Sequence, residues 1–410
     1  MSLRMFCPRI ALFLAGCAAF INLYATQGLL NELATAFDVS ARQASWSITV
    51  TTLAVALAAL FVGRLTTRAE QHRVIAVAAI LLALPALLTA WSGSFAEFLL
   101  WRAVQGLLIP LVFATSIAYI GVRWRDGAVT EATSVYVAGT VLGGFCGRFL
   151  TGWVTEFADW RLALALLAGL SLILGLAIAW FLPPNSRTSV LPPAYRPGGR
   201  AERFSKPLLA AYAVGFCVLF AQIATFTYVG LHLSRAPFSL STGALGAIYS
   251  VFLLALVVVP IAGRLGKARP RSELITAAAC LGIAGSLLTL TSSLWLTIAG
   301  LALSSTGVFL AQAAANAFIT AHARVDKAGA VGLYLTSYYL GGSFGAFVPG
   351  TLWELGGWPA CVALIMVFQI LPLLAIRRGW KVPALPVMPG ASASKRLIHH
   401  PTRKMSDDRE

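Results

Sequence analysis

Charge is what this chain most conspicuously lacks. Charged side chains make up 11% of its 410 residues, against 58% hydrophobic residues, whereas a soluble globular protein carries about 25% charged residues. Several stretches contain no charged side chain at all, and the one at 274–321 could cross a membrane twice at about 20 residues per crossing. Such stretches are too long for barrel strands, so a lipid environment requires helices. The composition therefore predicts an all-α integral membrane protein.

Cysteines and recognisable catalytic motifs are also scarce. The six cysteines occur singly, without the close spacing of metal ligands or redox pairs. Metalloprotease, phosphate-loop and dinucleotide motifs are missing. A Gly-x-Ser-x-Gly pattern occurs at 341–345, but it lies in a hydrophobic helical segment and not at the strand-to-helix turn that a hydrolase needs. We expect no enzymatic activity, no metal and no cofactor, with proton coupling left open.

The apolar segments are separated by charged or turn-rich breaks and predict twelve transmembrane helices. A proline-rich, basic linker at 183–206 divides the chain into six-helix bundles at 1–182 and 207–376, followed by a disordered basic tail at 377–410. The predicted spans lie at 10–31, 45–63, 74–92, 95–120, 130–153, 161–182, 207–231, 242–263, 274–292, 294–320, 330–353 and 359–376.

The second half of the chain repeats the first. Residues 135–160 align without a gap on residues 333–358 with nine identities, which include four glycines, Glu156 and Trp160. Shared hydrophobicity alone would not place the glycines, the glutamate and the tryptophan alike. Two pseudo-symmetric six-helix bundles predict a substrate path between them near the middle of the membrane.

Positive charge follows the predicted membrane topology. The net charge is +16, and on one side 26 lysines and arginines lie in the N-terminus, the loops at 64–73, 121–129, 183–206, 264–273 and 321–329, and the tail. The other side carries three, Arg42, Arg161 and Arg235. The positive-inside bias predicts that both termini are cytoplasmic. This distribution indicates contact with membrane lipids and argues against a nucleic-acid partner.

Particular motifs resemble the Major Facilitator Superfamily along the whole chain. Arg102, Gln105 and Gly106 in LLWRAVQG resemble its fourth-span signature, and the glycine stripe at 139–147 resembles the fifth span of its drug/proton antiporter branch. SYYLGGSFGAF and ADWR are similar to the YnfM-like permeases of bacterial inner membranes. The resemblance implies a monomeric secondary transporter of the inner membrane that works by alternating access and acts in export.

One loop departs from the family pattern. In GRLTTRAEQH, Gly63, Leu65 and Arg68 match, but Thr67 stands in place of an acid and Glu70 in place of a glycine. The loop therefore lacks the acid that the family's charge relay uses at this position.

Two arginines lie inside predicted spans, and the repeat serves as an internal control for them. Arg148 corresponds to Ala346 and Arg102 to Leu303, so the scaffold needs neither charge. An arginine at the bilayer centre costs about 3 kcal/mol on insertion scales. Because side chains lean toward the helix N-terminus, Arg102 could reach the nearer membrane surface, whereas Arg148 leans toward the membrane centre. We interpret Arg148 as functional, and Arg102 as functional because it matches the family signature.

Other polar residues on six spans predict a shared aqueous cavity, and no Asp or Glu occupies the middle of any span. The predicted gating residues are Gly63, Arg64, Arg68, Gly143, Gly147, Gly341 and Gly345, for which close helix packing is an alternative role. The predicted pathway residues are Arg148, Arg102, Gln105, Tyr24, Gln27, Asn31, Thr140, Gln222, Thr225, Gln312, Asn316, Tyr334 and Tyr338.

A cavity with two arginines and no acid has a positive potential, which favours anionic or neutral polar solutes over lipophilic cations. We therefore expect a secondary transporter that exports a small polar or anionic solute. Two alternatives stay open: a multidrug/proton antiporter for lipophilic compounds, and a lipid flippase whose arginines bind phosphate groups.

Overall fold

The computed structural model describes residues 3–66, 70–125, 127–185, 199–323, 325 and 327–380. Nearly all of these residues are helical, and none of them lies in a strand. Within them, nine helices are long and apolar enough to cross a membrane. The predicted all-α membrane fold is confirmed.

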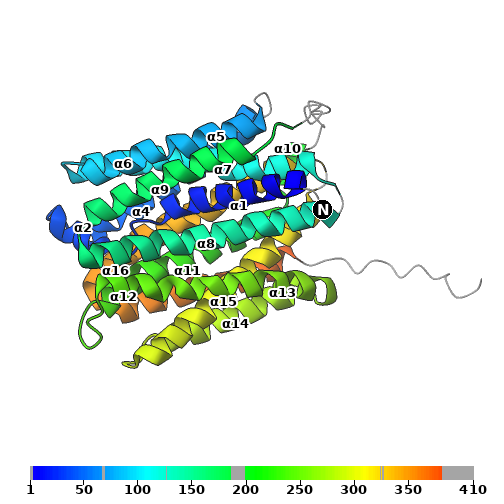
Figure 1. Cartoon of the computed structure of the whole chain (residues 1–410). Helices are drawn as coiled ribbons and strands as arrows, with labels where there is room; N and C mark the ends of the chain where they lie inside the picture. The colour runs from blue at the N-terminus through cyan, green and yellow to red at the C-terminus, as the bar shows by residue number, and fades with distance from the viewer. Residues whose placement is uncertain are drawn as a thin grey trace, which may run out of the picture. The chain divides into compact units, whose positions relative to one another are not determined.

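The first half is built of helices that run along the bundle, and some of them follow one another in line (Figure 1). Its helices are α1 (Leu3–Leu23), α2 (Leu30–Ala36), α3 (Ala41–Ala44), α4 (Trp46–Thr66), α5 (Gln71–Leu81), α6 (Ala83–Trp91), α7 (Phe95–Arg123), α8 (Gly127–Phe157) and α9 (Trp160–Phe181).

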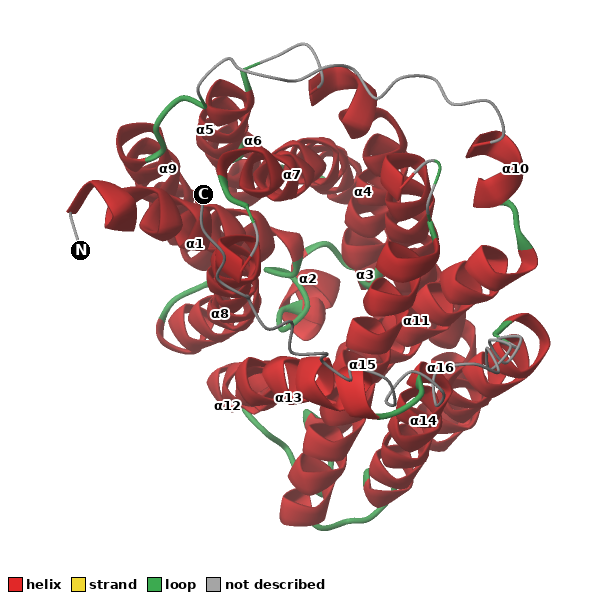
Figure 2. Cartoon of the chain, turned by 90° about the vertical axis from the view of Figure 1, so that its right-hand side faces the viewer, coloured by secondary structure: helices red, strands yellow, loops and turns green. Residues whose placement is uncertain are grey.

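The second half begins after the short helix α10 (Gly199–Arg203). Its helices are α11 (Lys206–Leu233), α12 (Thr242–Ile248), the 3₁₀ helix η1 (Tyr249–Leu254), α13 (Ala255–Ala268), α14 (Arg271–Leu288), α15 (Leu294–His322) and α16 (Lys327–Gly379). The last helix contains both predicted spans 330–353 and 359–376, and the chain turns between them at Gly357, whose φ of 62° favours glycine. Viewed end-on, the helices of each half lie together (Figure 2).

Residues up to Trp380 form one compact unit, which includes both halves. The two halves therefore pack on each other, although the basic linker separates them in the sequence. Most of that linker, residues 186–198, and the tail from residue 381 lie outside the described residues.

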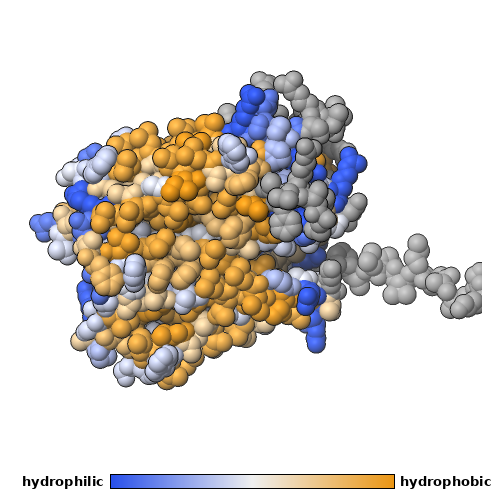
Figure 3. Space-filling view, viewed as in Figure 1, coloured by the Kyte–Doolittle hydropathy of each residue, from blue (hydrophilic) through white to orange (hydrophobic). Residues whose placement is uncertain are grey.

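Short polar residues start the helices at the end of the bundle that carries α2, which we call the α2 end. Ser40, Ser94, Asp159 and Ser241 each accept a hydrogen bond from the backbone N–H three residues later. These N-caps satisfy donors that a helix start leaves free. The side of the bundle between its two ends is largely apolar (Figure 3), and hydrophobic side chains in the middle of helices are exposed, such as Leu57 of α4 and Ile173 of α9. Such a band fits a lipid environment.

Glycines let two helices touch at equivalent places in each half. A Cβ on Gly143 of α8 would lie 2.6 Å from the Cα of Cys17 in α1, and a Cβ on Gly341 of α16 would lie 2.7 Å from the carbonyl carbon of Phe216 in α11. Gly147 and Gly345 approach Ile21 and Phe220 in the same way. The repeated glycines therefore hold each half together by close backbone contact.

Candidate functional site

The two halves meet along two pairs of helices. Helix α4 packs on α16, and α8 packs on α12 and η1. Arg148 of α8 lies in the second of these contacts, with 3% of its surface exposed. Its side chain points neither into lipid nor to a membrane surface. The guanidinium is held at the boundary between the halves.

Neutral groups hold the Arg148 guanidinium in place. Its Nε donates to Gln27 Oε1 at 2.7 Å, and its Nη1 donates to the Gly144 carbonyl at 2.5 Å. The Gln27 amide is oriented by the other half, because its Nε2 donates to Thr227 Oγ1 at 3.0 Å. The Tyr249 hydroxyl lies 3.2 Å from the Gln27 carbonyl oxygen. Gln27 therefore links Arg148 of the first half to α11 and η1 of the second.

Aromatic rings surround this charge, and no acid neutralises it. The Arg148 Cζ lies 4.2 Å from the ring centroid of Tyr24, 4.7 Å from that of Phe252 and 5.2 Å from that of Tyr249. Cation–π contacts stabilise a desolvated guanidinium in part. Within the described part of the chain, no carboxylate forms an ion pair with Arg148, and its Nη2 donates no hydrogen bond. The site therefore holds one uncompensated positive charge.

A cluster of five tyrosines extends the site, and we call it the tyrosine cluster: Tyr24, Tyr136, Tyr334, Tyr338 and Tyr339. The rings of Tyr338 and Tyr339 lie 5.3 Å apart at 88°, and those of Tyr334 and Tyr338 lie 5.9 Å apart. Tyr339 lies near Tyr24, Tyr136 and Tyr334, and Tyr338 lies near Tyr24. Two members come from the first half and three from the second, so the cluster also spans the boundary.

Arg102 has a different environment, although it was also a predicted pathway residue. It is 1% exposed and donates to the carbonyls of Asn22 at 3.0 Å, Leu23 at 2.9 Å and Ser47 at 3.4 Å. A further bond reaches Gln105. Helix α1 ends at Leu23, so its last carbonyls lack partners within the helix. Arg102 supplies these partners from inside the first half, and it does not reach a membrane surface as its position in the sequence had suggested.

The other predicted pathway residues are scattered. On α11, Gln222 and Thr225 are buried, and Thr225 Oγ1 has no partner. On α8, Thr140 Oγ1 donates to the Val137 carbonyl of its own helix at 2.7 Å. Asn31 and Gln312 are half-buried, and Asn316 is exposed. The structure brings Tyr24, Gln27, Arg148, Tyr334 and Tyr338 together, whereas Arg102 and Gln105 lie behind the end of α1.

The predicted gating residues fall into two groups. Gly143, Gly147, Gly341 and Gly345 pack helices within one half, where they keep that half rigid. Gly63 and Arg64 lie in the last turns of α4, and Arg68 is outside the described residues.

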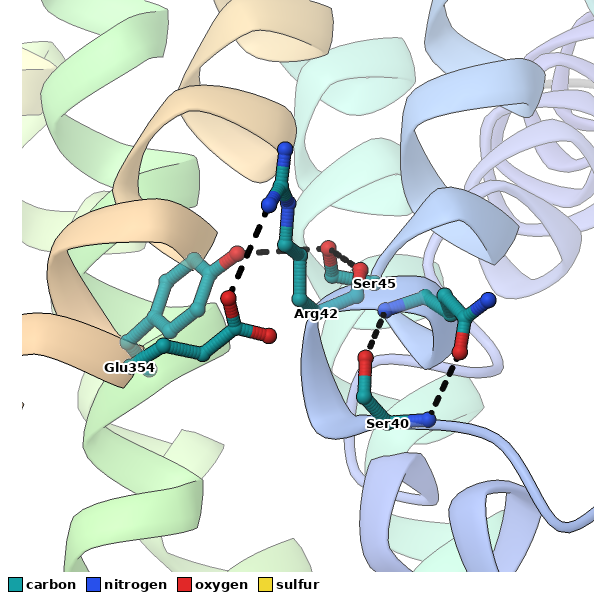
Figure 4. Close-up of polar contacts among 6 residues, drawn as sticks. Ser40, Arg42, Ser45 and Glu354 are labelled. Atoms are coloured by element: carbon teal, nitrogen blue, oxygen red, sulfur yellow. Dashed lines mark hydrogen bonds and ion pairs between the residues drawn. The ribbon is translucent and has the colours of Figure 1, made fainter.

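Polar contacts join the halves at the α2 end. Arg42 Nη1 lies 3.6 Å from Glu354 Oε2 (Figure 4). Beside this pair, Ser45 Oγ lies 3.1 Å from the Ala346 carbonyl oxygen, and the Tyr228 hydroxyl donates to the same oxygen at 2.6 Å. We call the Arg42–Glu354 pair the first latch.

A second latch lies at the equivalent place. Glu156 occupies the position in the repeat that Glu354 occupies in the second half, and its Oε2 accepts a hydrogen bond from the Gly243 N–H at 2.9 Å. Arg42 and Gly243 each lie two residues after the N-cap serine of their helix. Glu32 and Thr242 are also hydrogen-bonded there. We call the Glu156–Gly243 contact the second latch. The equivalent glutamates thus have different partners: Glu354 pairs with the Arg42 side chain, and Glu156 accepts from the Gly243 backbone N–H.

Sequence reasoning missed several residues of the site: Tyr136, Thr227, Tyr249, Phe252 and Tyr339. Tyr136 occupies the position in the repeat that the predicted Tyr334 occupies in the second half, and that identity could have indicated Tyr136. Tyr249 and Phe252 lie in the 3₁₀ segment η1, which no sequence pattern singled out. Among the described residues, no group of three or more His, Cys, Asp or Glu could hold a metal ion.

Comparison of the sequence with known proteins shows the family to which the chain belongs. The family model of the Major Facilitator Superfamily matches residues 12–346. The inner membrane transport protein YnfM of Escherichia coli (strain K12) is 31% identical over 369 residues, which are 89% of this chain and 88% of that protein. A chloramphenicol efflux pump of Mycobacterium tuberculosis is 28% identical over 373 residues, 86% of this chain and 88% of the pump.

A solved structure shares the fold. The crystal structure of a bacterial homolog of the human lysosomal transporter Spinster, in an inward-facing and unoccupied conformation, has a TM-score of 0.73 at 16% identity and covers 93% of this chain and 99% of its own. The chain therefore belongs to the Major Facilitator Superfamily and is a multi-pass membrane protein of a transporter family. The resemblance to the YnfM-like permeases is confirmed.

Proposed function

We propose that this protein is a secondary active transporter that exports a small anionic or polar solute across the bacterial inner membrane by alternating access. The observation that carries the proposal is Arg148, a buried guanidinium between the halves with no acid beside it. A buried charge without a counter-ion is unfavourable, and an anionic solute would neutralise it. Each half can move as a rigid body because its glycine contacts lock its own helices together.

The direction of opening follows from charge bias and from the latches. The positive-inside bias supports an external position for the α2 end, and both latches join the halves at that end. A solute would then reach Arg148 from the cytoplasm. The export direction itself is supported only by the resemblance to efflux proteins of the family.

Two alternatives make different predictions. The similarity to a chloramphenicol efflux pump favours export of lipophilic drugs as a second candidate. A lipid flippase is less favoured, because Arg148 is buried at the boundary between the halves and is not exposed on the apolar outer surface.

Transport by proteoliposomes tests the proposal. Purified protein would be reconstituted, loaded with an unlabelled organic anion and assayed for counterflow of labelled anions, sugars, a quaternary ammonium dye and a fluorescent lipid. We expect anion counterflow that Arg148→Ala reduces at least about tenfold, because a charge-assisted hydrogen bond contributes about 1.5–3 kcal/mol. A parallel assay with an imposed pH gradient would show whether protons are coupled.

The matched control is Arg148→Lys, which keeps the charge and should retain part of the counterflow. Equal melting temperatures of the variants in detergent would establish that both fold. Transport of the dye or the lipid that depends on Arg148, without anion transport, would contradict the proposal.

A further inference from the structure

The site presents far more hydrogen-bond donors than the protein satisfies. The Tyr136 and Tyr334 hydroxyls are fully buried without a partner. The hydroxyls of Tyr24, Tyr338 and Tyr339 make no hydrogen bond to any described residue, and these side chains are 7%, 6% and 3% exposed. Buried polar groups are nearly always paired in proteins. A ligand with strong acceptor atoms would supply the missing partners.

We infer that the solute is an aromatic monoanion, typified by an arenecarboxylate, with its carboxylate on Arg148 and its ring against the tyrosine cluster. This inference rests on the proposed function and narrows it to one chemical class. Three properties of the site carry it: its single charge, its aromatic walls and its unpaired hydroxyls.

The single charge limits the ligand to one negative charge. Arg148 is the one cation that the described residues place in this site, because Arg102 is committed to the carbonyls of Asn22, Leu23 and Ser47. A dicarboxylate would leave its second carboxylate buried without a cation, which is strongly unfavourable. A neutral solute would leave the Arg148 guanidinium without a counter-ion, as it is in the unliganded protein.

The aromatic walls favour a planar ring over an aliphatic chain. Tyr24, Tyr249 and Phe252 surround the guanidinium, and Tyr338 and Tyr339 meet edge to face at 88°. Aromatic pairs prefer edge-to-face or offset arrangements and gain stability beyond their buried area. Phe113 of α7 continues this surface, with its ring 5.7 Å from that of Tyr339. An aromatic ring that enters here meets such partners from both halves.

The experiment is a titration calorimetry series on the purified full-length protein in detergent. The four probes are benzoate, benzamide, cyclohexanecarboxylate and terephthalate, and each of the last three differs from benzoate in one property: charge, aromaticity or a second carboxylate. Relative to benzoate at neutral pH, we expect benzamide to bind at least about tenfold more weakly, because it lacks the charge. Terephthalate should be weaker by a similar factor, and cyclohexanecarboxylate by about fivefold, the size of an aromatic-pair contribution.

Variants at one tyrosine separate the ring from the hydroxyl. Tyr338→Leu should reduce the preference for benzoate over cyclohexanecarboxylate to less than about twofold, because it removes an aromatic wall. Tyr338→Phe keeps the ring and should keep that preference, while both carboxylates bind less tightly. The control is Tyr119→Phe, whose hydroxyl bonds to the Pro183 carbonyl away from the site, and it should leave all four affinities unchanged.

The outcomes separate this inference from the proposed function. If benzoate and cyclohexanecarboxylate bind equally in the native protein, or terephthalate binds best, the inference is wrong although an anion transporter remains. If no carboxylate binds and Arg148→Ala leaves transport intact, the proposed function fails as well. If Tyr338→Leu does not fold, Tyr338→Phe and the four native affinities still decide between these outcomes.

Discussion

The two halves differ most in their first helices. In the first half, the first crossing breaks after Leu23 into α1 and α2, and in the second half α11 runs unbroken from Lys206 to Leu233. Arg102 donates to the carbonyls that this break exposes, and Leu303 is its counterpart in the repeat. A broken helix in lipid needs internal donors, and an intact helix does not. The burial of Arg102 is thus explained by the backbone carbonyls to which it donates.

The second difference concerns Arg148 and its counterpart Ala346. Arg148 contacts neutral groups and aromatic rings at the boundary between the halves. At the equivalent place, Ala346 offers its carbonyl oxygen to Ser45 and Tyr228. The comparison teaches that the two arginines, neither of which pairs with a described carboxylate, differ in what surrounds them: Arg102 bonds to backbone carbonyls of its own half, and Arg148 is the residue to which we assign the proposed solute.

The largest expected effect is a loss of stability on substitution of Arg102, and it distinguishes the roles of Arg102 and Arg148. Arg102→Leu copies the second half and removes the donors to the Asn22 and Leu23 carbonyls and to the Gln105 amide oxygen, which costs about 1–3 kcal/mol for each. About 3 kcal/mol is regained because no charge is buried, so we expect a net destabilisation of about 3 kcal/mol. The melting temperature in detergent should fall by several degrees, whereas that of Arg148→Ala should change little. If Arg102→Leu melted like the native protein, the assignment of Arg102 to the helix break would be wrong.

The next largest effect tests the close helix packing at equivalent glycines, which the two halves share. Gly143→Ala and Gly341→Ala should each destabilise the protein by about 1–3 kcal/mol, since both would push a Cβ into the backbone of a neighbouring helix. Gly144→Ala is the matched control, because the nearest atom to its Cβ is Arg148 Nη1 at 3.4 Å. Chemical denaturation in mild detergent would rank the three variants. Equal stability of Gly143→Ala and Gly144→Ala would refute close packing at Gly143.

The smallest expected effect is on the opening of the α2 end, and it distinguishes the two latches. The Arg42 and Glu354 side chains are 35% and 44% exposed, so their ion pair contributes less than about 1 kcal/mol. Glu354→Gln should raise the opening of the α2 end by no more than about fivefold. Glu156→Gln should change it by less than about twofold, because an amide oxygen can still accept the bond from the Gly243 N–H.

Opening can be measured as the rate at which an impermeant maleimide labels Asn31→Cys in an otherwise cysteine-free protein. Glu273→Gln is the control, because it removes an exposed pair with Arg269 on another part of the molecule. A larger effect of Glu156→Gln than of Glu354→Gln would contradict the difference between the latches.

The scaffold was largely predictable from the sequence, whereas the site was predictable only in part. Uncharged runs predict helices, and the repeated glycines predict contacts that the structure has in both halves. Arg148 and Gln27 were predicted because polar groups in apolar runs are conspicuous. Tyr249 and Phe252 were missed, because aromatic residues in a membrane helix look alike whether they face lipid or a solute.

The sequence by itself determined the helical membrane fold, the duplication and the excess of positive charge without buried acid. These follow from composition and spacing, since lipid allows few backbone solutions. Only the tertiary structure decided which arginine is satisfied by the protein and which is not. That distinction depends on where α1 breaks and on which helices of the other half lie opposite, and contacts between residues far apart in the chain set both.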